Sequence, residues 1–191
     1  FSFMLQEQMA VRNAVGIIDY SMLGKMMVEG RDAERFLQRL CSNNMAINIG
    51  SVTYTLMLNQ HGGIETDVTV ARYATNSFMV MSSIIRTRRD HIYIKNAILD
   101  DEDVYLQNVT TANAVLSICG PKSRELLTEF CEADFCNYGF PLYSLKQICL
   151  GNAKVFAQRL SFTGALGWEI FVTPDFAAVS YTHLRAHETD R

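Results

Sequence analysis

Two carboxylates occur in strands that are otherwise apolar, and each follows a glycine turn. Asp67 comes after Gly62-Gly63, and Glu169 comes after the turn at residues 163–167. A buried carboxylate can accept two hydrogen bonds from adjacent N–H donors, such as those on the edge of a pterin ring. A second carboxylate can hold or withdraw a proton at a nitrogen nucleophile. The spacing leaves two interpretations open, a pair that binds a ligand or two acids that face the surface.

The hairpin around Asp67 is the clearest structural element of the sequence. Residues 54–58 predict an apolar strand, residues 60–63 a turn in which glycine supplies positive φ at low cost, and residues 64–70 the returning strand. Strand alternation places the even-numbered residues of the returning strand on one face and the odd-numbered residues on the other. We therefore expect Asp67 and Glu65 to point away from the main apolar layer, toward water or a ligand.

Helices and strands interleave along the rest of the chain. We expect helices at residues 4–14, 32–41, 86–99 and 121–131, and strands at residues 25–28, 77–83, 104–109 and 114–118, with two more between residues 147 and 172. Asp32 is the expected N-cap of its helix. The arginines that begin the helix at 86–99 oppose its dipole, which favours a solvated face. The order of elements predicts an α+β fold with antiparallel pairs.

Composition narrows the functional classes. The chain has 191 residues, of which 49% are hydrophobic and 19% charged, so it can bury a core in one compact unit or two small ones. A net charge of -3 gives no basic stripe for nucleic acid, and no run of 18 apolar residues predicts a membrane span. The five cysteines form no C-x-x-C pair, which favours reduced, mostly buried thiols over a metal site.

The two ends of the chain carry separate expectations. The chain starts at Phe1 with neither a methionine nor a signal segment, which indicates a piece of a longer protein whose targeting information is not encoded here. Residues 179–191 lose the apolar periodicity and resemble a translated adapter tail found on unrelated proteins. We therefore expect one partial domain at residues 1–178 and a non-native tail at residues 179–191.

Several short motifs together resemble a known family. They lie at residues 16–21, 30–33, 37–44, 54–72, 118–124, 140–141 and 164–169. Over about residues 8–179 the sequence resembles the folate-binding domain of the glycine-cleavage T-protein (aminomethyltransferase). It is most similar to the form fused in sarcosine and dimethylglycine dehydrogenases and in the pyruvate dehydrogenase phosphatase regulatory subunit. The resemblance implies a cloverleaf of α+β subdomains, with antiparallel sheets and flanking helices, that is incomplete at the C-terminus.

The resemblance also implies a tetrahydrofolate site and roles for individual residues. Asp67 would lie near the folate nitrogens that accept the one-carbon unit and would manage a proton there. Glu169 would hold the pterin edge, and Tyr54 would help to line the pocket. Phe162 stands where the family usually has a tyrosine against the ring, and Ser83 stands where the T-protein often has asparagine.

The fused dehydrogenases imply a specific role for the chain. It would be the tetrahydrofolate-binding region of a flavin-dependent N-methyl amine dehydrogenase and would capture the one-carbon unit as 5,10-methylenetetrahydrofolate. FAD would be held by an upstream domain of the same polypeptide, outside this chain. The expected compartment is the mitochondrial matrix in a eukaryote and the cytoplasm otherwise.

Two alternatives to this role stay open. One is a non-catalytic regulatory module, favoured by Ala165, which stands where the family usually has glutamate. The other is a stand-alone aminomethyltransferase. Glu65-Thr66-Asp67 argues against it, because the T-protein more often has paired aspartates at this place.

Overall fold

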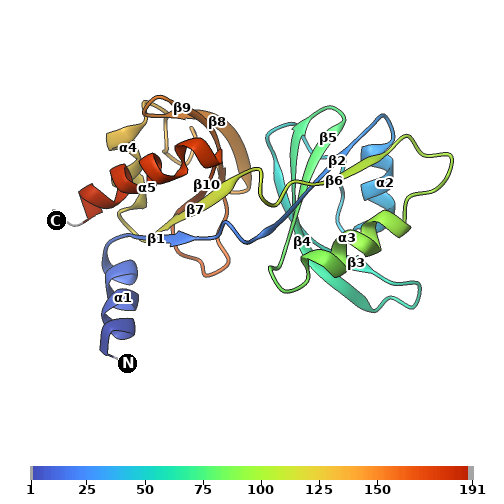
Figure 1. Ribbon diagram of the computed structural model, residues 1–191, viewed down its shortest axis with the longest axis horizontal. Coiled ribbons are helices and arrows are strands. Elements are labelled where there is room, and N and C mark those ends of the chain that lie inside the picture. Colours follow the sequence, from blue (N-terminus) through green and yellow to red (C-terminus); the bar gives the residue numbers. More distant parts are fainter. Residues whose placement is uncertain (1, 189–191) are drawn as a thin grey trace. The chain divides into compact units, whose positions relative to one another are not determined.

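The computed structural model describes residues 2–188 of the chain, which forms two compact units (Figure 1). The first unit combines the segment up to Ser21 with the segment from Ala112 onward, and the second spans Met22–Thr111. Each unit is built on a five-stranded sheet in which every described pair of strands is antiparallel. The expected α+β fold with antiparallel sheets is confirmed.

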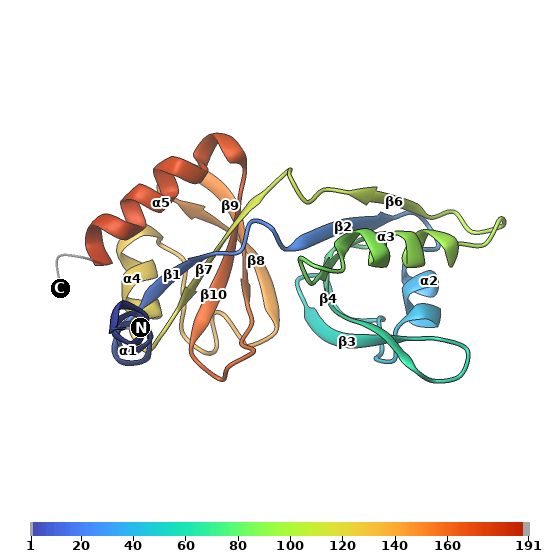
Figure 2. The same cartoon turned by 60° about the horizontal axis from the view of Figure 1, so that its bottom comes forward.

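The sheet of the first unit has the strand order β1-β7-β10-β9-β8. Its elements are α1 (Ser2–Asn13), β1 (Gly16–Asp19), β7 (Ala114–Cys119), α4 (Ser123–Phe130), β8 (Ser144–Leu150), β9 (Ala153–Arg159), β10 (Gly167–Val172) and α5 (Pro174–Glu188). Trp168 and Ile170 of β10 share a buried core with Leu127 of α4 and Leu184 of α5. The two helices therefore cover one face of this sheet (Figure 2).

The sheet of the second unit has the strand order β3-β4-β5-β2-β6. Its elements are β2 (Gly24–Glu29), α2 (Ala33–Leu40), β3 (Val52–Leu58), β4 (Ile64–Ala74), β5 (Ser77–Ser82), α3 (Thr87–Asn96) and β6 (Tyr105–Asn108). Phe36 and Leu37 of α2 and Ile94 of α3 pack against Val68 and Val70 of β4. Both helices therefore cover the same face of this sheet.

Three local expectations are corrected by the structure. Gly16–Asp19 is a strand that the sequence did not indicate, because its four residues become a strand only by pairing with the distant β7. Residues 144–172 hold three strands rather than two. Asp32 occupies the N-cap position of α2 but makes no side-chain cap bond; its carboxylate accepts the Asp103 N–H at 3.0 Å instead.

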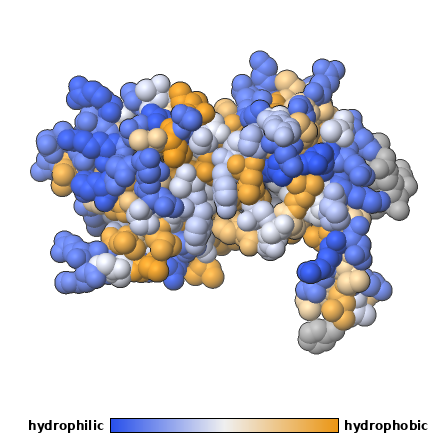
Figure 3. Space-filling model, turned by 180° about the vertical axis from the view of Figure 1, so that it is seen from behind, coloured by the Kyte–Doolittle hydropathy of each residue, from blue (hydrophilic) through white to orange (hydrophobic). Residues whose placement is uncertain are grey.

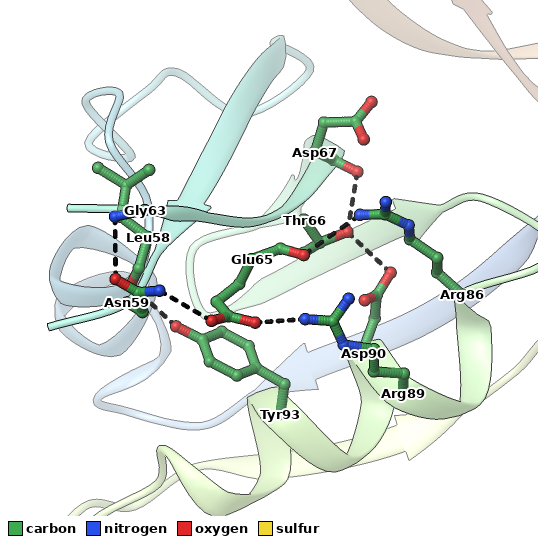
Figure 4. Close-up of polar contacts among 10 residues, drawn as sticks. All are labelled: Leu58, Asn59, Gly63, Glu65, Thr66, Asp67, Arg86, Arg89, Asp90 and Tyr93. Carbon is green, nitrogen blue, oxygen red and sulfur yellow. Dashed lines mark hydrogen bonds and ion pairs between the residues drawn. The ribbon is translucent and has the colours of Figure 1, made fainter. Parts of the chain in front are cut away.

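A β-bulge overturns the predicted orientation of Glu65. Met57 is opposite Thr66 and Leu58 is opposite Ile64, so Glu65 is an extra residue on β4. Its carboxylate accepts a hydrogen bond from Asn59 at 3.0 Å and pairs with Arg89 of α3. Simple alternation fails at this residue, and Glu65 points toward α3, whereas Asp67 points away from it (Figure 4).

Two glycines at turns differ in how much room surrounds them, which gives a test of the fold. Gly30 has φ of +131°, and a Cβ there would lie 2.1 Å from the carbonyl oxygen of Asp103. Gly62 has φ of +78°, as expected for the hairpin turn, and a Cβ there would meet nothing within 4 Å. We expect Gly30→Ala to lower the free energy of unfolding by about 2–4 kcal/mol. Gly62→Ala should cost only about 1 kcal/mol. Urea denaturation followed by circular dichroism measures both, and equal losses would contradict the close approach of the Asp103 backbone to Gly30.

The outer helices carry apolar side chains at the surface. In α1, the side chains of Phe3, Met4, Leu5 and Met9 are all exposed. Figure 3 shows apolar residues among the polar ones on this helix, at the lower right of that view. No helix in the part of the chain that the structure describes is long and apolar enough to cross a membrane.

Among the thiols, Cys41 and Cys131 are buried but Cys136 and Cys149 are exposed, so the expectation of mostly buried cysteines holds only in part.

The predicted tail overlaps the last helix. α5 continues to Glu188, and the side chain of Leu184 is buried in the core of the first unit. Residues 189–191 of the predicted tail lie outside the described residues. The non-native origin of residues 179–191 stays a prediction.

Candidate functional site

Asp67 lies on the face of the second sheet that α2 and α3 leave uncovered. Its neighbours in β4, Thr66 and Val68, are buried on the helix side, and the Asp67 side chain is exposed. The Tyr54 hydroxyl donates a hydrogen bond to Oδ2 of Asp67 at 3.2 Å. Desolvation, and after it the negative charge of Asp67, raises the pKa of Tyr54, which keeps the phenol protonated as a donor. The sequence-based orientation of Asp67 is confirmed.

Ser83 is the first residue after β5. The β4–β5 ladder ends with Val68 opposite Ser82, so Ser83 is the residue that follows on the Asp67 side. Its carbonyl oxygen accepts the Arg86 N–H at 3.0 Å and the Thr87 hydroxyl at 3.1 Å, which shapes the turn into α3. The second unit therefore holds three of the five candidate residues, Tyr54, Asp67 and Ser83, and a hydrogen bond joins the first two.

The face around Asp67 is partly lined by buried side chains. Tyr54 is opposite Thr69, and Thr69 is opposite Met81 on β5, so the three side chains form one row across the sheet. Thr69 and Met81 are buried, whereas Tyr54 is 41% exposed. An exposed carboxylate beside a tyrosine hydroxyl and a closely packed row is an arrangement that can accept a proton from a bound molecule.

Glu169 lies on β10 in the first unit and is almost fully buried, with 5% exposure. It faces away from the core that holds Trp168 and Ile170. The Gln158 side-chain amide donates a hydrogen bond to Oε2 of Glu169 at 2.6 Å. Desolvation raises the pKa of Glu169, and the hydrogen bond from Gln158 offsets part of this rise. The interpretation of Glu169 as an acid that faces the surface is therefore wrong.

Phe162 belongs to the same unit as Glu169. It lies in the loop between β9 and β10, and its side chain is 67% exposed. The first unit thus carries Glu169 and Phe162, and the second carries the other three candidates. Gln158 had no signal in the sequence, because only the pairing of β9 with β10 places it opposite Glu169.

Comparison with known proteins identifies the family. Residues 1–190 match the family described as the GCVT N-terminal domain. Aminomethyltransferases from Caldanaerobacter subterraneus subsp. tengcongensis and from Thermotoga neapolitana are 30% and 31% identical to the chain, over 93% of its length. The chain spans about half of these relatives, 47% and 48%.

Two solved structures share the fold. The chain matches glycine cleavage system aminomethyltransferase T from Bartonella henselae with a TM-score of 0.81 and 22% identity, over 94% of this chain and 48% of that one. It matches a chain of the heterotetrameric sarcosine oxidase from Corynebacterium sp. U-96 with a TM-score of 0.69 and 15% identity, over 97% and 91%. The resemblance seen in the sequence motifs is confirmed, and the chain belongs to the GCVT N-terminal domain family.

Proposed function

We propose that this region binds tetrahydrofolate and takes part in one-carbon transfer, with Asp67 as the proton acceptor. The observation that carries the proposal is the exposed carboxylate of Asp67 beside the Tyr54 hydroxyl. The aminomethyltransferase relatives support the same reaction class. The chain spans only about half the length of those relatives. The one-carbon transfer activity of the whole protein is therefore itself a proposal.

The chemistry of the transfer calls for one base. When a methylene iminium gives its carbon to the two N–H groups of tetrahydrofolate, two C–N single bonds form and the C=N double bond to the amine breaks. One of the two displaced protons leaves on the released amine, and the other must go to a base. Asp67 can accept this proton and pass it to water, because its side chain is exposed. The Tyr54 hydroxyl holds the carboxylate in orientation through Oδ2.

Glu169 suits the recognition of a pterin edge. Its carboxylate can accept two adjacent N–H donors, and burial makes such charge-assisted hydrogen bonds stronger than they are in water. Gln158 holds the side chain in place through Oε2. In the first unit, we propose that Glu169 and Phe162 hold the pterin. In the second unit, we propose that Asp67 manages the proton, with Tyr54 and Ser83 as further contacts.

Within this function, we propose the setting of a flavin-dependent N-methyl amine dehydrogenase of the sarcosine or dimethylglycine type. The Glu65-Thr66-Asp67 form supports it over a stand-alone aminomethyltransferase. The sarcosine oxidase match adds a likeness of fold. Oxidation of the amine would belong to FAD on another domain, and none of the residues assigned here would take part in it.

A non-catalytic regulatory module is the second candidate, favoured by Ala165 at a place where the family usually has glutamate. Anaerobic titration of tetrahydrofolate into the protein separates the two. Our proposal predicts saturable binding and, at a hundred times the dissociation constant, a gain of about 2.7 kcal/mol in the free energy of unfolding. Calorimetry and thermal melts measure these quantities. Absence of both heat and stabilisation would favour the regulatory module.

A further inference from the structure

The part of β4 that leads to Asp67 has a strand neighbour on one side only. Pairing with β5 ends at Val68, whereas pairing with β3 continues to Ile64. Residues 64–67 therefore lack half of the ladder that holds the rest of β4. A backbone segment of this kind needs other partners if a side chain on it is to keep a fixed position.

Side chains of α3 and of its N-cap residue, Arg86, supply those partners. Arg86, Arg89, Asp90 and Tyr93 follow the i, i+3, i+4, i+7 spacing of one helix face, and we call them the α3 clamp. Each member contacts the hairpin (Figure 4). Arg86 donates to the Glu65 carbonyl at 3.3 Å, Arg89 pairs with the Glu65 carboxylate, and Tyr93 donates to the Leu58 carbonyl at 2.9 Å. Arg86, Arg88 and Arg89 are exposed, as expected for a solvated face, but Arg86 and Arg89 also bind Glu65.

The contact at Thr66 and Asp90 is the buried part of the clamp. The Thr66 hydroxyl donates to Oδ2 of Asp90 at 2.9 Å, and both residues are 1% exposed. The same hydroxyl lies 3.4 Å from the carbonyl oxygen of Asp67. The hydroxyl has one proton, which goes to the nearer oxygen, that of Asp90, so the contact with Asp67 adds no second hydrogen bond. The Thr66–Asp90 bond therefore ties α3 to the residue directly before the candidate proton acceptor.

We propose that Thr66 and Asp90 are positioning residues that fix the backbone under Asp67 for proton transfer. The inference rests on the proposed function. Thr66 faces the helix while Asp67 faces the opposite side of the sheet, so neither Thr66 nor Asp90 need touch the ligand. Loss of the link should misplace the carboxylate and slow the reaction without removing a binding contact.

Thr66→Val tests this proposal, with Thr66→Ser as the matched control. The valine variant keeps the shape but loses the hydroxyl, and the serine variant keeps the hydroxyl. We expect Thr66→Val to lower the rate constant of one-carbon transfer roughly tenfold, with the tetrahydrofolate dissociation constant changed less than twofold. Thr66→Ser should stay within about twofold of the parent in both quantities. Equal rates for the two variants would overturn the proposal.

Hydrogen exchange separates this proposal from the proposed function. In the chain without ligand, Thr66→Val should speed amide exchange in residues 64–67 about tenfold and leave β5 unchanged. If Thr66→Val exchanges faster but the parent protein binds no folate, the proposed function is wrong and the link between Thr66 and Asp90 is supported. If exchange in Thr66→Val is unchanged, the link between Thr66 and Asp90 is wrong.

If Thr66→Val does not fold, two exposed arginines of α3 allow a second test of the α3 clamp. Arg89 is bonded to Glu65, and Arg88 lies outside the clamp face. Arg89→Gln should speed exchange in residues 64–67 several-fold, and Arg88→Gln should not. Equal exchange in the two arginine variants would contradict the clamp.

Discussion

Asp67→Asn is expected to lower the rate of 5,10-methylenetetrahydrofolate formation about a hundredfold, the size typical of a lost general base. The amide keeps the shape of the side chain and can still accept the Tyr54 hydrogen bond, but it cannot take up a proton at neutral pH. Tetrahydrofolate affinity and thermal stability should change little, because the side chain is exposed. Single-turnover kinetics with the one-carbon donor measure the effect.

Asp101→Asn is the matched control for this variant. Asp101 is also exposed, but it belongs to the loop between α3 and β6 and not to the β3–β4 hairpin. The control removes the same charge and should keep the parent rate within about twofold. A rate for Asp67→Asn equal to that of the control would show that Asp67 does not manage the proton.

Glu169→Gln is expected to act in opposite directions on binding and on stability. An amide presents an N–H group toward the N–H donors of the pterin edge, so tetrahydrofolate affinity should fall at least tenfold, or about 1.4 kcal/mol. Stability at neutral pH should rise, because the variant no longer buries an ionisable carboxylate. The amide can still accept the hydrogen bond of Gln158. A purely structural Glu169 would not give this combination.

The pH dependence follows from the raised pKa of Glu169. Folded protein binds this proton more tightly than unfolded protein, whose carboxyl has its ordinary pKa of 4.5. The stability that accompanies protonation is fully present below pH 4.5 and is lost as the pH rises through the folded-state pKa. Urea denaturation at a series of pH values from below 4.5 upward should show a smaller loss of unfolding free energy for Glu169→Gln than for the parent. Parallel pH profiles would contradict the assignment.

The hairpin and the orientation of Asp67 could be predicted from the sequence, because both depend on neighbours along the chain. Apolar alternation, a glycine turn and a single interrupting carboxylate are local signals. The same rule failed at Glu65, since the bulge that turns it toward Arg89 depends on pairing with β3. One inserted residue was enough to move a side chain to the other face.

Contacts between distant segments account for what the sequence did not indicate. The burial of Glu169 and its bond to Gln158 require β9 and β10 to pair, and β1 exists only through its pairing with β7. The contacts of α3 with the hairpin were likewise not predicted, because they join segments that are distant in the sequence. A row of arginines at a helix start has the same sequence pattern whether it faces water or binds a hairpin.

A regulatory module and a catalytic domain differ most clearly in how the Asp67 carboxylate responds when tetrahydrofolate is added. Carbon-13 labelling of aspartate carboxyl groups gives one signal that Asp67→Asn removes, and this identifies it. On titration with tetrahydrofolate, we predict that this signal shifts and saturates together with the heat of binding, while the Asp101 signal stays in place. Saturable binding with an unmoved Asp67 signal would contradict the central claim that this carboxylate meets the folate.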